Sequence, residues 1–135
     1  MRIFASPKES GKITDDEAME SLRPHCKNIY LSDTYFSLMS KEEIAKFLDI
    51  DRTNFKKWEN ETCDCDNFSY QLMGYFSKWN YSFCFGIAWS DLHAFNIFID
   101  DKKEIYVVEP QSDQILKLDE VITNPKYYPF KLVLI

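Results

Sequence analysis

A cysteine directly before a strongly helical stretch is the first feature of this chain that could do chemistry. Cys65 precedes residues 68–79, where apolar residues recur at three- and four-residue intervals, as on one face of an α-helix. The free N–H groups and positive dipole end of a helix start favour an anion, so the spacing predicts a thiol biased towards thiolate, its reactive form. The alternative is that Asp64 or Asp66 only caps the helix and the cysteines are small core residues.

A histidine and a glutamate follow on two segments rich in β-branched and aromatic residues. Residues 93–99 and 105–109 have the texture of strands, and the polar residues 100–104 between them predict a hairpin turn. In such a hairpin His93 and Glu109 share one face, provided that the turn holds an odd number of residues or a bulge restores the parity. We therefore expect the imidazole and the carboxylate to lie within reach of a hydrogen bond.

Cys65, His93 and Glu109 together are the parts of a thiol nucleophile, its general base and the group that orients the base. His93 would accept the thiol proton, and Glu109 would hold the imidazole in the required tautomer. The Cys65 backbone N–H and the side chains of Trp58 and Gln111 are the candidate oxyanion donors. The pattern favours a thiol-dependent hydrolase, with Cys65 as the fastest-alkylating thiol near neutral pH.

The composition is typical of one globular domain spanning residues 1–135. Hydrophobic residues make up 45% of the chain and aromatic residues 16%, which excludes a disordered or low-complexity chain. A net charge of −6 without a long basic run argues against nucleic acid as a partner. No stretch approaches the roughly eighteen apolar residues of a membrane span, and the N-terminus turns polar too early for a signal peptide. We therefore expect a soluble, cytoplasmic protein with no membrane partner.

The order of the elements predicts an α+β fold, in which helices of the N-terminal half pack on a C-terminal antiparallel sheet. Capping boxes that begin at Thr14 and at Ser40 open two of the expected helices. Besides the hairpin, the expected elements are helices at 14–22, 41–48 and 66–79, a loop at 51–61, and strands at 82–89 and 130–134.

Three short motifs resemble those of a known family. Residues 64–68 (DCDNF), 93–96 (HAFN) and 108–111 (VEPQ) resemble the cysteine, histidine and glutamate motifs of the papain-like, calcium-activated cysteine protease domain at the C-terminus of the Marasmius oreades agglutinin, a mushroom lectin. The resemblance implies a papain-like fold and the nucleophile, base and orienting roles already given. It also matches Trp58 and Gln111 to a tryptophan and a glutamine of that active site.

The same resemblance implies a cofactor and a substrate. Acidic residues around the cysteine of that family contribute to calcium binding, which makes Asp64, Asp66 and Asn67 the candidate ligands here. The implied substrate is a peptide or a protein. The chain shows no β-trefoil portion, so we do not expect the lectin activity to carry over. The oligomeric state stays open, with a homodimer as one option.

Two further classes of protein stay open. One is a non-catalytic binding module on a papain-like scaffold, which the acidic charge and the many aromatic residues permit. The other is a zinc-stabilised domain, although Cys-x-Cys is a poor spacing for zinc. Without secretion signals the four cysteines are expected to be free thiols. The candidate zinc ligands are Cys63, Cys65, Cys84 and His93, or His25 with Cys26.

Overall fold

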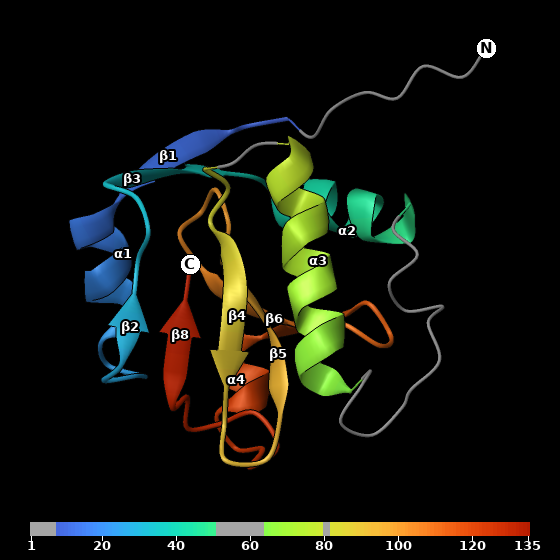
Figure 1. Cartoon of the computed structure of the whole chain (residues 1–135). Helices are drawn as coiled ribbons and strands as arrows, with labels where there is room; N and C mark the ends of the chain where they lie inside the picture. The colour runs from blue at the N-terminus through green and yellow to red at the C-terminus, as the bar shows by residue number, and fades with distance from the viewer. Residues whose placement is uncertain (1–7, 51–63, 80–81) are drawn as a thin grey trace.

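The computed structural model describes residues 8–50, 64–79 and 82–135. Its centre is a six-stranded sheet with the strand order β2-β8-β4-β5-β6-β7, and β1 and β3 pair in a separate two-stranded sheet (Figure 1). The strands are β1 (Gly11–Thr14), β2 (Ile29–Tyr30), β3 (Tyr35–Leu38), β4 (Phe85–Trp89), β5 (Ala94–Ile99), β6 (Ile105–Glu109), β7 (Gln114–Lys117) and β8 (Leu132–Leu134). The helices are α1 (Asp15–Leu22), α2 (Lys41–Ile50), α3 (Cys65–Trp79) and α4 (Leu118–Val121).

The hairpin of β5 and β6 has the register that the sequence predicts. Ile99 pairs with Ile105 in an antiparallel ladder, and the turn between them holds an odd number of residues. Continued along the strands, this register places Glu109 opposite Phe95 and diagonal to His93, on the same face of the sheet. The predicted parity is therefore confirmed.

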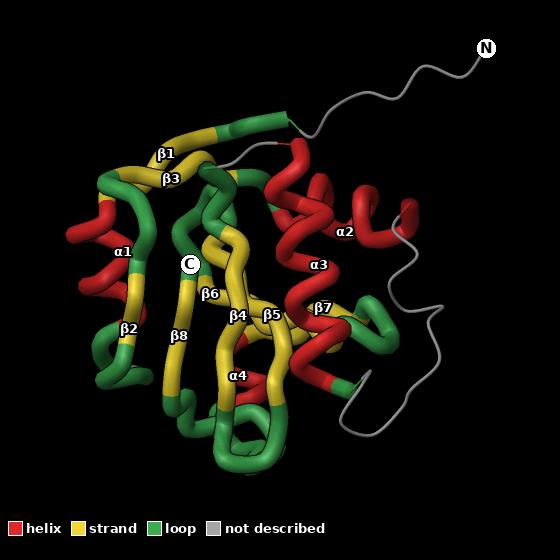
Figure 2. The backbone as a smooth tube through the Cα atoms, in the orientation of Figure 1, coloured by secondary structure: helices red, strands yellow, loops and turns green. Residues whose placement is uncertain are grey.

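The central sheet is buried on both faces. On one face Ile97 and Val107 pack in a cluster with Leu22 of α1. On the other face Phe98 and its neighbours pack against Phe76 of α3 and the apolar residues of α2. Alternating strand residues thus feed two apolar cores, and their removal from water is the main force that holds the layers together. Figure 2 shows α2 and α3 on one side of the strands and α1 on the other.

α3 begins at Cys65, within one residue of the predicted start. Phe68, Leu72 and Phe76 are buried at the helical spacing that the sequence showed. At 15 residues α3 is the longest helix in the described part of the chain. Its N-terminal end lies at the end of the sheet where β5 begins (Figure 1). The prediction that Cys65 stands at a helix start is confirmed.

The expected division into N-terminal helices and a C-terminal antiparallel sheet is correct only in part. β2 comes from the N-terminal half and pairs with β8 in parallel, so the sheet is mixed. β2, β3, β7 and α4 form where the sequence predicts no regular element. Each spans four residues or fewer, too short for a periodic pattern. β2 and β3 form through pairing with strands that are distant in the chain, β8 and β1. The predicted loop at 51–61 lies outside the described residues.

Two general expectations concern the cysteines and the membrane. Cys26, Cys65 and Cys84 are free thiols, as expected, while Cys63 lies outside the described residues. Within the described ranges, no helix combines the length and the apolar character that spanning a bilayer requires.

Candidate functional site

A histidine and a carboxylate form a close pair at one end of the sheet. His93 Nε2 lies 2.6 Å from Glu109 Oε1. His93 comes from the end of the turn between β4 and β5, and Glu109 is the last residue of β6. Their side chains are only 9% and 8% exposed. The predicted hydrogen bond is confirmed, and its shelter from water strengthens it.

The Glu109 carboxylate is surrounded by donors. The Tyr127 hydroxyl donates to Oε1 at 3.1 Å, Lys126 Nζ lies 3.4 Å from the same oxygen, and the Gln111 N–H donates to Oε2 at 3.4 Å. Burial alone would raise the pKa of the Glu109 carboxyl. The hydrogen bond and charge of His93, with the charge of Lys126 and the Gln111 N–H, outweigh burial, so the pKa is lowered. Glu109 is therefore a carboxylate at neutral pH.

Sequence reasoning missed several residues that position this pair. Tyr127 and Lys126 lie in the loop before β8, far from Glu109 in the chain and without a periodic pattern. Ser90 accepts hydrogen bonds from the Leu92 and His93 N–H groups and donates to the Lys126 carbonyl oxygen. The signal for Ser90 was present, because a serine between two strand patterns favours a turn that its hydroxyl stabilises. For Tyr127 the sequence holds no such signal.

Cys65 lies beside the start of β5, but its thiol is not a thiolate. Burial raises the pKa of the Cys65 thiol, the Ala94 N–H opposes this, and the charges of Asp66 and Asp64 raise it further. Its Sγ lies 3.7 Å from Asp66 Oδ1, to which it can donate. The direction of this shift is opposite to the lowered pKa that the sequence predicts. Partial burial and the two carboxylates raise the pKa of the thiol more than the Ala94 N–H lowers it.

We expect Cys65 to react with iodoacetamide more slowly near neutral pH than an unperturbed cysteine, whose pKa is about 8.5. Its rate should keep rising above that pH, because the raised pKa keeps the thiol protonated. Asp66→Asn should accelerate the reaction, since it removes a charge that opposes the thiolate. Peptide mapping by mass spectrometry measures the rate at each cysteine. Asp119→Asn, at an exposed residue of α4, is the matched control and should leave the rate at Cys65 unchanged. If the rate at Cys65 reaches its plateau below neutral pH, the pKa of this thiol is not raised.

The residues proposed for calcium do not form a cage. Asn67 Oδ1 accepts a hydrogen bond from the Asp64 N–H at 3.1 Å, which ties the Asn67 side chain to the first turn of α3. Across the described ranges, no group of three or more His, Cys, Asp or Glu side chains is arranged to hold a metal ion. Weak calcium binding at these residues stays a prediction.

The alternative zinc ligands are also engaged elsewhere. Cys84 is 3% exposed in the apolar core, and burial raises the pKa of its thiol to about 12. The Cys26 thiol donates to the Asn28 carbonyl oxygen at 3.2 Å, and His25 Nδ1 lies 3.0 Å from the Tyr128 hydroxyl. Of the two candidate side-chain oxyanion donors, Gln111 lies next to the pair and gives its backbone N–H to Glu109, and Trp58 lies outside the described residues.

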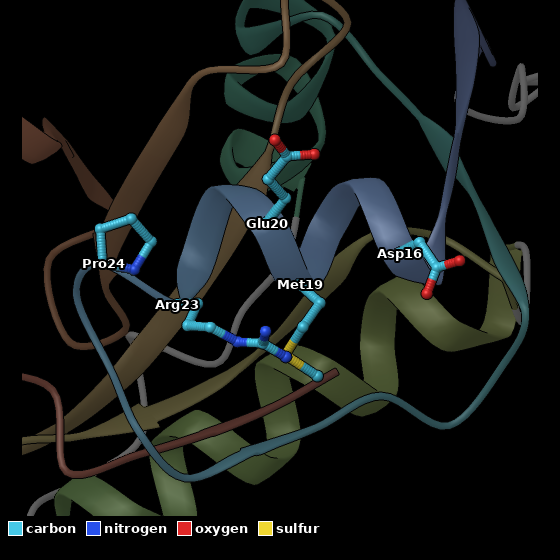
Figure 3. Close-up of a pocket in the computed structure, with 5 residues that line it drawn as sticks. All are labelled: Asp16, Met19, Glu20, Arg23 and Pro24. Carbon is cyan, nitrogen blue, oxygen red and sulfur yellow. The ribbon is translucent and has the colours of Figure 1, made fainter.

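One cavity of the molecule lies away from this cluster. It has a volume of about 510 Å³ and is lined by residues of α1 and of the turn that follows it. Figure 3 shows the Arg23 and Met19 side chains on the same side of the helix and Glu20 on the opposite side. Neither Cys65 nor His93 lines it. The candidate site is therefore defined by its hydrogen bonds and not by this cavity.

The fold is a mixed helix-and-sheet domain that two solved structures share. One is described as a PSL1a complex with E64, and the other as Polyporus squamosus lectin bound to the human-type influenza-binding epitope Neu5Acα2-6Galβ1-4GlcNAc. The TM-scores are 0.73 and 0.75, and each match is 20% identical over 92% of this chain. The chain spans about half the length of each, 50% and 49%. No family model matches the chain, and no curated protein matches it.

These comparisons contradict the expectation of a papain-like cysteine peptidase with a peptide or protein substrate. The structural neighbours are described as Polyporus squamosus lectin structures, and neither is described as a protease domain. The hydrolase interpretation of Cys65, His93 and Glu109 is corrected accordingly, and the raised pKa of the Cys65 thiol agrees with the correction.

Proposed function

We propose that this chain is a non-catalytic binding module whose ligand is a carbohydrate. The observation that carries the proposal is the likeness of 92% of the chain to Polyporus squamosus lectin structures, one of them described with a bound sialylated trisaccharide. At this level of identity the likeness concerns the fold, and the ligand class is our inference. This chain spans only about half of the lectin chain, and the glycan is described for the whole lectin. We therefore use that glycan only as a probe of the proposed site.

The proposed binding surface is formed by two aromatic rings at the Cys65 end of α3. Tyr70 of α3 is 50% exposed, and its ring centroid lies 6.3 Å from that of the partly exposed Trp89. Trp89 is the last residue of β4 and pairs with Ala94, whose N–H lies beside the Cys65 sulfur. Exposed aromatic rings offer flat apolar faces with polar edges, which suits the C–H face of a pyranose ring.

Polar groups at the same end of the sheet suit the hydroxyl groups of a sugar. Lys126 is half exposed and lies 3.4 Å from Glu109, so its ammonium group keeps N–H bonds free for a ligand. The His93 ring is fixed by Glu109 and stands at the rim of the same end of the sheet. A few fixed polar groups next to apolar rings are the usual composition of a small-molecule site.

Titration of the labelled chain with Neu5Acα2-6Galβ1-4GlcNAc, followed by two-dimensional NMR, tests the proposal. Amide shifts should concentrate at Tyr70, Trp89 and the β4–β5 turn. Tyr70→Ala should weaken binding about tenfold, the usual cost of removing an aromatic anchor. Tyr35→Ala, which removes a ring that is 54% exposed on β3, is the matched control and should bind as the wild type does.

Three results would contradict the proposal. The first is equal weakening by both tyrosine variants, and the second is no amide shift at any glycan concentration in the millimolar range. The third comes from E64, with which one structural neighbour is described in complex. We expect the intact mass of the chain to stay unchanged after incubation with this compound. A covalent adduct at Cys65 would show that the thiol is reactive and would count against a non-catalytic module.

A further inference from the structure

A second cavity lies between the turn that follows α1 and the loop that precedes β8. Its volume is about 370 Å³, within the range of small-molecule sites. The two segments are tied together by the Asn28 side-chain amide, which donates to the Lys131 carbonyl oxygen at 3.1 Å, and by the contact of His25 Nδ1 with the Tyr128 hydroxyl at 3.0 Å. Figure 1 shows these segments beside the ends of β2 and β8. We call this cavity the cationic groove.

The groove is positively charged in an acidic protein. The chain as a whole carries a charge of −6, yet Arg23, Lys27 and Lys131 line the groove, and no lining residue is Asp or Glu. Lys131 forms an ion pair with Asp91 at 2.9 Å. In the described ranges the ion pairs include neither Arg23 nor Lys27. At physiological salt, charges beyond about 8 Å are screened, so these nearby cations outweigh the net charge for a ligand in the groove.

Apolar surface lies between these cations. Pro24, Tyr128, Pro129 and Phe130 line the groove together with the buried Cys26. The Tyr128 ring meets the His25 ring edge-on, with centroids 6.0 Å apart. A ligand that fits this surface has a flat apolar body as well as a negative charge.

We propose that the cationic groove binds a small anion, a carboxylate or a phosphate monoester attached to a flat apolar group. Arg23 offers a planar guanidinium fork that matches two oxygens of either anion, and Lys27 adds a second positive charge. None of Cys65, His93, Glu109, Tyr70 and Trp89 lines the groove. This site is therefore separate from the carbohydrate surface and does not depend on it.

The test uses phenyl phosphate and benzoate as the two anionic probes and benzyl alcohol as the neutral probe of similar shape. Each is titrated into the labelled chain and followed by two-dimensional NMR. We expect both anions to shift the amides of residues 23–28 and of Tyr128 and Lys131, and the affinity to fall as salt is raised. Tighter binding of phenyl phosphate assigns phosphate as the ligand class, and tighter binding of benzoate assigns carboxylate.

Variants separate a specific site from a general attraction of anions. Arg23→Gln should weaken the binding of the preferred anion about tenfold, as for the loss of a hydrogen bond to a charged group. Lys102→Gln makes the same change of charge at an exposed lysine outside the groove and should have no effect. The melting temperatures of both variants verify that they are folded. Equal weakening by both variants, equal shifts with benzyl alcohol, or anion shifts that miss the groove would overturn the proposal.

Discussion

Gly86→Ala is expected to destabilise the fold by about 3 kcal/mol or more, a severe case of overpacking. Gly86 lies in β4, between β5 and β8 at the centre of the sheet. A Cβ atom there would collide with the Leu134 carbonyl oxygen and would come within 2.8 Å of Ile135 Cγ1 and 2.9 Å of Ile135 Cα. Two of these three atoms are backbone, so they can move aside only if the β4–β8 ladder is distorted.

Gly74→Ala is the matched control for this substitution. Gly74 lies in α3, and no heavy atom lies within 4 Å of a Cβ built on it. Alanine in a helix interior is more stable than glycine by about 1 kcal/mol, so this variant should be more stable than the wild type. Urea unfolding followed by circular dichroism measures both variants. A Gly86→Ala variant as stable as the wild type would show that β8 does not lie where the structure places it.

Glu109→Ala should cost about 2–4 kcal/mol of stability, because it leaves the buried Tyr127 hydroxyl and the His93 ring without their common acceptor. Glu109→Gln should cost less, since its amide oxygen can still accept one of these bonds. The same urea experiment measures both variants. If both cost the same, the hydrogen bonds would not be the reason that Glu109 stabilises the fold.

The charge of Glu109 also makes the stability of the fold depend on pH. The pKa of its carboxyl is lowered in the folded state, whereas in the unfolded chain a glutamate has a pKa of about 4.3. This contribution is therefore complete above the unfolded value and is lost as the pH falls through the folded value. Glu109→Gln should remove this part of the acid destabilisation, which urea unfolding at a series of pH values measures. If the stability of Glu109→Gln falls with decreasing pH as steeply as that of the wild type, other carboxylates cause the acid destabilisation.

Local patterns predicted the parts of the structure that local rules determine. The capping box at Thr14 is present, with the Glu17 N–H donating to the Thr14 hydroxyl at 3.1 Å. The start of α3 at Cys65 and the parity of the β5–β6 hairpin follow from helix spacing and strand alternation. These features depend on residues that are near each other in the chain, so one sequence is enough to infer them.

The sequence patterns did not predict which distant segments pair or how burial shifts a pKa. The pairing of β2 with β8 and the contact of Tyr127 with Glu109 join segments that no periodicity connects. The pKa of the Cys65 thiol depends first on its burial, which the spacing of residues does not show. The motifs around Cys65 and His93 thus predicted positions correctly, while the class of function inferred from them was wrong. Positions of residues on a fold do not by themselves determine its chemistry.

In the proposed non-catalytic binding module, Cys65, His93 and Glu109 perform no thiol-dependent hydrolysis. Incubation of the chain with a quenched fluorescent protein substrate, in reducing buffer with and without calcium, tests it most directly. We expect the wild type to release fluorescence no faster than Cys65→Ala under either condition. Release that requires both Cys65 and His93, and that is lost in Cys65→Ala and His93→Ala variants that remain folded, would contradict it.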